Sequence, residues 1–316
     1  MRLRAATLAV VILVALAGCG GGDGDGAQRS SQLPPAGGGG TLTYALPSLP
    51  RRLDPLAAKD RFAQTVTRQI YEPLIAQLSG PYGQAPTQPG LVEDVRPSEK
   101  RSIWTLDLRP GVRFQDGTPF NAAAVLANSR RWQSDPRGQA LLPDLFAVDA
   151  PTPEEVRFLL DQPVRNLPQL LASPRLGIVS PKALEPQNGQ AARFLPDARN
   201  SGTGAFQAGS SGPARLELLR FAGWWGSPMG LGPALDGVIF VVAPKSGQRY
   251  RMLSEGTVQV ADPLDAVALR AADADPLLST IGGPESGIGL ECSVRGFSAA
   301  GAIPTLSAVW LTRLTG

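Results

Sequence analysis

The sequence of 316 residues contains no histidine. This absence removes the usual general base, the Ser-His and Cys-His nucleophilic pairs, and the commonest metal ligand. No lysine stands three residues after a serine, so the Ser-x-x-Lys arrangement is missing as well. Residues 209–212 (Gly-Ser-Ser-Gly) fall short of a nucleophile elbow, and residues 202–204 (Gly-Thr-Gly) lack the third glycine of a dinucleotide loop. We therefore expect a protein that is not an enzyme and that uses no metal and no cofactor.

Cysteine is scarce, and one of the two cysteines, Cys19, closes a distinctive N-terminal segment. Two arginines precede an uncharged apolar run over residues 5–17, which is the layout of a secretory signal. The run is shorter than the roughly 20 residues that a bilayer-spanning helix needs. Residues 16–19 (Leu-Ala-Gly-Cys) resemble the lipobox of bacterial lipoproteins. We expect residues 1–18 to be a lipoprotein signal peptide and Cys19 to carry lipid, which anchors the protein on the extracytoplasmic face of the cell membrane. An ordinary secretory signal with a chance cysteine is the alternative.

A glycine-rich stretch follows, over residues 19–40. It cannot bury enough apolar surface to fold, so we expect a flexible tether. Its Asp-Gly-Asp-Gly run at residues 23–26 lacks the later ligands and closing glutamate of a calcium loop. With Cys19 lipidated, Cys292 has no partner for an internal disulfide.

Charge is nearly balanced, with 30 basic and 27 acidic residues. Removal of Arg2 and Arg4 with the signal leaves 28 basic against 27 acidic residues. A nearly neutral chain gives no reason to expect nucleic-acid binding. The roughly 276 residues after the tether are enough for one large domain or two small ones.

Periodicity predicts strands and helices that are mixed along the chain, which favours an α/β (mixed α+β) fold. Asp60 is expected to cap a helix whose apolar stripe runs from Phe62 to Leu74, and Asn121 a helix that reaches about Trp132. Asp116 and the glycine after it predict a turn. The expected strands are residues 41–46, 103–108, 156–160, 215–219, 238–242 and 258–261, and two further helices are expected at residues 246–254 and 263–272.

Several short motifs follow one another in an order that is typical of one family. The longest is the block at residues 104–122, WTLDLRPGVRFQDGTPFNA. The others are LDP at 53–55, IYEPL at 70–74, PGLV at 89–92, GTGAF at 202–206, WW at 224–225 and LSEGTVQVA at 253–261. This series resembles the oligopeptide/dipeptide/nickel class of extracellular solute-binding proteins, the capture subunits of ABC importers. The resemblance spans roughly residues 41–272.

The resemblance implies a fold like that of periplasmic binding proteins, in which a cleft forms between two lobes. It implies a first lobe over residues 41–272, with an inserted subdomain at about residues 76–200. Residues 273–316 would be a remnant of a second lobe that is largely missing here. The family's contacts on the first lobe resemble the loop after the first strand, so Pro47, Ser48 and Leu49 are the expected ligand contacts.

Most individual motif residues are expected to be structural. Trp224 and Trp225 are expected to pack rather than to form a ligand platform. Residues 202–204 are expected to let a strand begin close to a neighbouring backbone.

Three functions remain open at this point. The first is a lipid-anchored, extracytoplasmic substrate-binding component of an ABC importer, with peptides or similar small solutes as ligands and the permease subunits and the membrane as partners. The alternative is a degenerate or one-lobed scaffold lipoprotein that acts in protein–protein interaction without ligand capture. The third is a hydrolase that uses two carboxylates, which would need such a pair within reach in a pocket.

Overall fold

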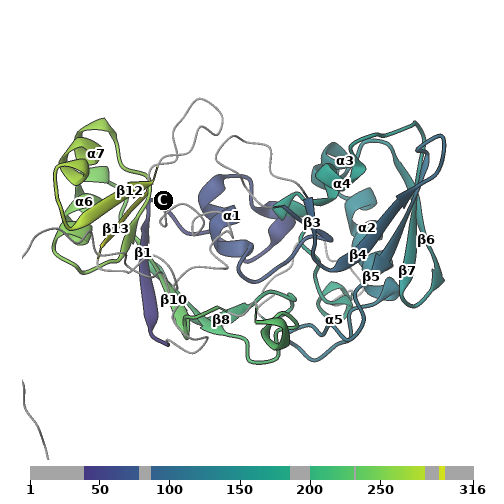
Figure 1. The fold of residues 1–316 in the computed structure, drawn as a ribbon, viewed down its shortest axis with the longest axis horizontal. Helices are drawn as coiled ribbons and strands as arrows, with labels where there is room; N and C mark the ends of the chain where they lie inside the picture. Colours follow the sequence, from purple (N-terminus) through teal and green to yellow (C-terminus); the bar gives the residue numbers. More distant parts are fainter. Residues whose placement is uncertain (1–38, 78–86, 186–199, 231–232, 282–291, 296–316) are drawn as a thin grey trace, which may run out of the picture. The chain divides into compact units, whose positions relative to one another are not determined.

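The computed structural model describes residues 39–77, 87–185, 200–230, 233–281 and 292–295 (Figure 1). The expected signal peptide, Cys19 and nearly all of the expected tether lie outside these residues. Among the described residues, no helix is long and apolar enough to cross a membrane.

The larger sheet has seven strands in the order β12-β13-β11-β1-β10-β9-β8. At its centre, β1 runs parallel to both β10 and β11, while the remaining neighbours are antiparallel. Leu42 and Leu46 of β1 are fully buried and pack with Phe240 of β10. The strands are β1 (Thr41–Leu46), β8 (Phe206–Gly212), β9 (Arg215–Arg220), β10 (Gly237–Val242), β11 (Val260–Ala261), β12 (Leu278–Ile281) and β13 (Cys292–Arg295).

A second, antiparallel sheet of four strands has the order β4-β5-β7-β6. Its strands are β4 (Val92–Pro97), β5 (Ile103–Leu108), β6 (Leu145–Thr152) and β7 (Glu155–Leu160), so all of them come from the sequence between β1 and β8. Helix α2 (Ala122–Ser134) contacts β6 and β7 (Figure 1). Trp104, Phe158 and Trp132 form part of the apolar core between them. A short pair, β2 (Ile75–Gln77) and β3 (Thr87–Pro89), completes the strands of the described residues.

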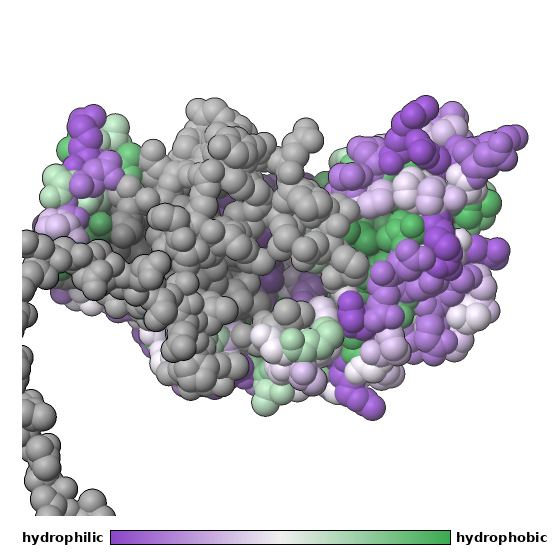
Figure 2. All heavy atoms as spheres, viewed as in Figure 1, coloured by the Kyte–Doolittle hydropathy of each residue, from purple (hydrophilic) through white to green (hydrophobic). Residues whose placement is uncertain are grey.

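The outer surface of the region formed by the second sheet and α2 is largely polar. Figure 2 shows hydrophilic residues over much of its visible face, with apolar groups between them. Arg96 on β4 pairs with Asp94, Asp107 and Glu155, all of them exposed or partly exposed. Exposed pairs of this kind contribute little stability each, so the apolar core and not these charges holds the sheet.

Several predicted caps and turns are confirmed. The side chain of Asp60 accepts a hydrogen bond from the amide of Ala63 at 2.9 Å, and that of Asn121 accepts one from Ala124 at 3.3 Å. Gly117 has a φ of 84°, which suits glycine in the predicted turn. The remaining helices are α3 (Pro136–Leu141), α4 (Leu167–Leu171), α5 (Pro181–Leu184), α6 (Ser246–Ser254) and α7 (Ala266–Asp273), with 3-10 turns η1 (Pro55–Ala57), η2 (Pro174–Leu176) and η3 (Ser227–Met229).

The prediction of one helix from Phe62 to Leu74 is wrong. Helix α1 (Arg61–Thr67) ends at Thr67, although Ile70 and Leu74 are buried as the apolar stripe requires. Pro73 disfavours a helical residue before it, and the carbonyls of residues 69 and 70 bond to a distant segment instead. Of the strand predicted at residues 258–261, only Val260 and Ala261 form a strand, β11. The helix predicted at residues 263–272 begins later, at Ala266, as α7.

The distant segment is residues 202–206, whose glycines lie against the backbone that follows α1. The amide of Gly204 donates to the carbonyl of Ile70 at 2.8 Å, and the amide of Phe206 donates to that of Gln69 at 3.1 Å. A Cβ at Gly202 would stand 1.9 Å from the carbonyl oxygen of Ile70. The expectation that these glycines let a strand begin close to another backbone is therefore confirmed.

Gly202→Ala tests this close approach. The methyl group collides with a backbone oxygen that cannot rotate away, so we expect a loss of about 3 kcal/mol in the free energy of unfolding. The melting temperature should fall by roughly 6–12 °C, because each kcal/mol shifts it by about 2–4 °C in a domain of this size. Gly247→Ala is the matched control: its Cβ meets nothing within 4 Å and it lies in α6, so its melting temperature should stay the same or rise slightly. Equal melting temperatures for the two variants would contradict the packing described here.

Candidate functional site

The parallel strands of the larger sheet end together at one edge. Strands β1, β10 and β11 are parallel, with Leu46 of β1 in register with Val242 of β10, so their carboxyl ends share this edge. The antiparallel hairpin of β8 and β9 brings its turn to the same edge, because Arg215 pairs with Val241. In open α/β sheets, ligands bind outside the carboxyl ends of parallel strands. A ligand site is therefore expected at this edge.

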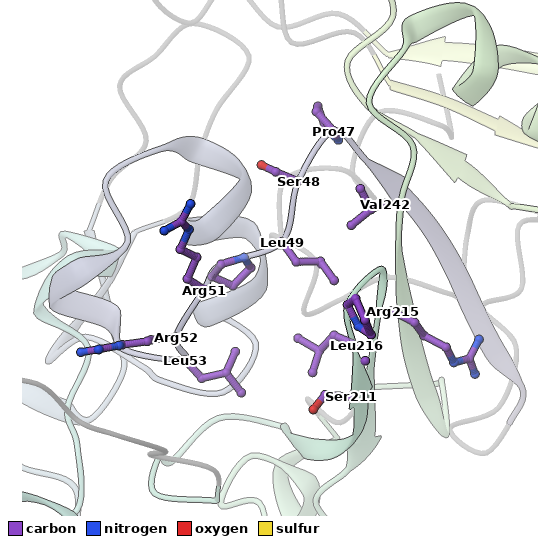
Figure 3. A pocket seen from close by; sticks show the side chains of 13 residues that line it. Pro47, Ser48, Leu49, Arg51, Arg52, Leu53, Ser211, Arg215, Leu216 and Val242 are labelled. Atoms are coloured by element: carbon purple, nitrogen blue, oxygen red, sulfur yellow. The ribbon is translucent and has the colours of Figure 1, made fainter.

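A cavity of about 530 Å³ lies there (Figure 3). One wall is the loop after β1, and the facing wall is the β8–β9 turn with the end of β10. The lining residues are Pro47, Ser48, Leu49, Pro50, Arg51, Arg52, Leu53, Ser211, Gly212, Pro213, Arg215, Leu216 and Val242. The structure thus brings the three expected contact residues, Pro47, Ser48 and Leu49, together in the lining, and their contact with a ligand stays a prediction.

The interior and the rim of this cavity differ in chemistry. Figure 3 shows the aliphatic side chains of Leu49, Leu216 and Val242 gathered in its middle. Leu216 is buried, and Leu49 packs partly against the core of the larger sheet. The arginine side chains extend outward on both sides of this apolar group (Figure 3). The cavity therefore offers an apolar floor and a basic rim.

Sequence reasoning missed the residues of the far wall. Residues 209–212 fall short of a nucleophile elbow, but Gly212 ends β8 and Pro213 begins the turn that faces the loop after β1. A Gly-Pro dipeptide between two alternating segments is a turn signal. No local signal links Arg215 with Arg51, which lies more than 160 residues earlier.

A buried carboxylate stabilises the edge beside the cavity. Asp262, directly after β11, accepts hydrogen bonds from both terminal nitrogens of Arg61 at 3.2 and 3.3 Å and from the hydroxyl of Tyr44 at 3.3 Å. Burial raises the pKa of the Asp262 carboxyl above its ordinary value, and the charge of Arg61 opposes part of that rise. These bonds tie the end of β11 to the start of α1, which follows the cavity loop.

The two adjacent tryptophans bind a second carboxylate, that of the partly buried Glu72. The indole nitrogen of Trp224 donates to one carboxylate oxygen at 3.2 Å, and that of Trp225 donates to the other at 2.8 Å. The guanidinium of Arg109 lies 4.6 Å from the centre of the Trp225 ring. Trp224 is buried in the core of the larger sheet and Trp225 packs against both cores. Both tryptophans therefore pack as expected. They also line a smaller cavity of about 390 Å³ with Arg109 and Glu93, so the expectation that they form no ligand platform stays a prediction.

The lining of the larger cavity contains no carboxylate, so it does not provide the acid pair that a carboxylate-dependent hydrolase needs. Within the described part of the chain, no three His, Cys, Asp or Glu residues are close enough to hold a metal ion. The features of the cavity are those of a binding surface, with a shaped apolar floor and polar groups at its edge.

Residues 87–291 match the family model described as bacterial extracellular solute-binding proteins, family 5, middle. The chain belongs to this family. The glutathione-binding protein GsiB of Escherichia coli K12 is 32% identical over 217 residues, which cover 67% of this chain and 40% of GsiB. The fold, an α/β fold like that of periplasmic binding proteins, matches NikA of Brucella suis in complex with Fe(III)-EDTA (TM-score 0.67, 23% identity, 77% of this chain and 48% of NikA). It also matches DppA of Helicobacter pylori in complex with the peptide STSA (TM-score 0.67, 20% identity, 77% of this chain and 50% of DppA).

These matches confirm the family resemblance and the fold class expected from the motifs. This chain spans less than half the length of GsiB and about half the length of the two solved structures.

The carboxyl of Glu72 should make stability depend on pH. Burial raises the pKa of this carboxyl to about 7, although the hydrogen bonds from the indoles of Trp225 and Trp224 lower the pKa in part. The folded chain therefore holds a proton that the unfolded chain releases between its ordinary pKa of 4.5 and about 7. Because the folded state then binds more protons, the free energy of unfolding falls as pH rises through this window. We expect Glu72→Gln to remove this slope in urea titrations at a series of pH values.

Glu99→Gln, which changes an exposed acid, is the control and should keep the slope of the unsubstituted chain. If Glu72→Gln and Glu99→Gln have equal slopes between pH 4.5 and 7, Glu72 does not titrate in this range.

Proposed function

We propose that the protein is a lipid-anchored, extracytoplasmic substrate-binding component of an ABC importer, and that its ligands are peptides or similar small solutes. The observation that carries the proposal is the cavity at the carboxyl edge of the parallel strands, in a chain that belongs to a solute-binding family. Relatives named for glutathione and for peptides support this class of ligand. Permease subunits in the membrane would be the partners.

We propose that Pro47, Ser48 and Leu49 contact the ligand. Their position supports this, because they line the cavity and follow directly after the central strand. Ser48 is exposed, whereas Leu49 is partly buried against the core and holds the loop in place. A ligand between the two walls would meet the backbone and side chain of Ser48 and the aliphatic part of Leu49.

The proposed division of the chain follows the same family pattern. Residues 1–18 are the signal peptide, residues 19–40 the lipidated tether, and residues 41–272 the first lobe with an inserted subdomain at about 76–200. Residues 273–316 are proposed as a remnant of the second lobe, and within them β12 and β13 join the sheet of the first lobe. The division is supported by the second sheet, whose strands all lie between residues 92 and 160.

Titration calorimetry of the purified chain with a panel of di- and tripeptides tests ligand capture. We expect measurable binding, and we expect Ser48→Phe to raise Kd by about tenfold or more, because the ring fills the cavity mouth; tenfold corresponds to about 1.4 kcal/mol. Ser48 is exposed, so the larger side chain should not disturb the core. Ser227→Phe, at another exposed serine, in the smaller cavity, is the control and should leave Kd unchanged. Flat titrations across the panel would contradict the proposal.

Lipid anchoring is tested by Cys19→Ser in a bacterial host that processes lipoproteins. We expect the parent chain in the membrane fraction and the Cys19→Ser chain in the soluble extracytoplasmic fraction, because several acyl chains anchor stably. Cys292→Ser keeps the proposed lipid site and should stay with the membrane. Membrane retention of Cys19→Ser after a salt wash would rule out this anchor.

A further inference from the structure

The lining of the larger cavity has an unbalanced charge. It includes the three arginines Arg51, Arg52 and Arg215 and no acidic residue. Several other arginines of the described structure pair with carboxylates, as Arg61 does with Asp262 and Arg131 with Asp54. A cavity whose lining carries one sign of charge concentrates solutes of the opposite charge.

Two of these arginines are available to a ligand. Arg51 and Arg215 are exposed, and neither guanidinium has a hydrogen bond or an ion pair with a side chain in the described part of the chain. They come from opposite walls, one from the loop after β1 and the other from the start of β9. Figure 3 shows them on either side of Leu49 and Leu216. Arg51 lies on a loop, and an exposed arginine changes rotamer within nanoseconds, so it can turn toward a ligand that rests on the apolar floor. Arg215 leaves β9 on the face opposite to Leu216, but it is the first residue of the strand, so its side chain can reach the cavity mouth over the end of the sheet.

We infer that the cavity selects solutes of net negative charge, with Arg51 and Arg215 as the residues that determine this specificity. The apolar part of the solute rests between Leu49, Leu216 and Val242, and its carboxylates meet the guanidinium groups at the rim. A guanidinium suits this role because its N–H groups match a carboxylate in a two-bond geometry. The inference depends on the proposed function, because it names the ligand class of the same cavity.

Three peptides that differ only in the central side chain test the inference by calorimetry on the purified full chain. They are Leu-Glu-Leu, Leu-Gln-Leu and Leu-Lys-Leu, whose net charges at pH 7 are negative, zero and positive. We expect Leu-Glu-Leu to bind about tenfold more tightly than Leu-Gln-Leu, and Leu-Lys-Leu to bind most weakly. Raising the salt concentration should narrow these differences, because exposed charges are screened.

The double variant Arg51→Gln and Arg215→Gln should bind all three peptides with similar affinity. Arg130→Gln, at an exposed arginine on α2, is the control and should retain the preference for Leu-Glu-Leu. Equal binding of the three peptides by the parent chain overturns the charge selection and leaves peptide capture standing. Failure of all three peptides to bind, together with flat titrations of the wider panel, overturns both.

Discussion

The close backbone contact between residues 69–70 and residues 202–206 is the constraint on which the rest of the structure depends. It occurs where the chain returns from the second sheet to the first, because β8 begins directly after it. The side chain of Gln115 lies in the same place, donating to the carbonyls of Gly204 and Phe206 at 3.1 and 2.7 Å. The turn of the longest family motif is thereby fixed to the start of β8. Since β8 leads to the turn that faces the loop after β1, this contact also positions the far wall of the larger cavity.

The near wall is held by a buried charge pair. The loop after β1 ends at Asp54, whose carboxylate accepts hydrogen bonds from Arg131 of α2 at 2.7 and 2.8 Å, with both side chains almost fully buried. The carbonyl of Leu53 also accepts a hydrogen bond from the hydroxyl of Tyr71 at 2.8 Å. A buried pair contributes little net stability because both charges lose water, yet loss of one partner is strongly unfavourable. The pair therefore fixes where the loop ends, and residues 47–52 before it are partly or fully exposed.

Local signals in the sequence were enough to predict the features that short segments determine alone. Asp60 and Asn121 cap helices because a side-chain oxygen can satisfy amides within the same turn, and Gly117 permits its turn through its own backbone. The end of α1 could not be predicted in this way, because the carbonyls of Gln69 and Ile70, just after it, bond to residues more than 130 positions later. The same limit applies to the site. The loop at residues 47–49 was found through the family resemblance, whereas Arg215 reaches the cavity only through the pairing of β9 with β10.

The chemistry of the cavity indicates how recognition and affinity are divided. Arg51 and Arg215 are exposed, so a carboxylate that meets them stays partly hydrated and gains modest energy. Charges in this situation act mainly on encounter and on the choice between solutes. The apolar floor contributes through Leu49 and Val242, which are partly exposed and present surface that a ligand removes from water. Changes at the rim should therefore alter which solute binds, and changes in the floor should alter how tightly any solute binds.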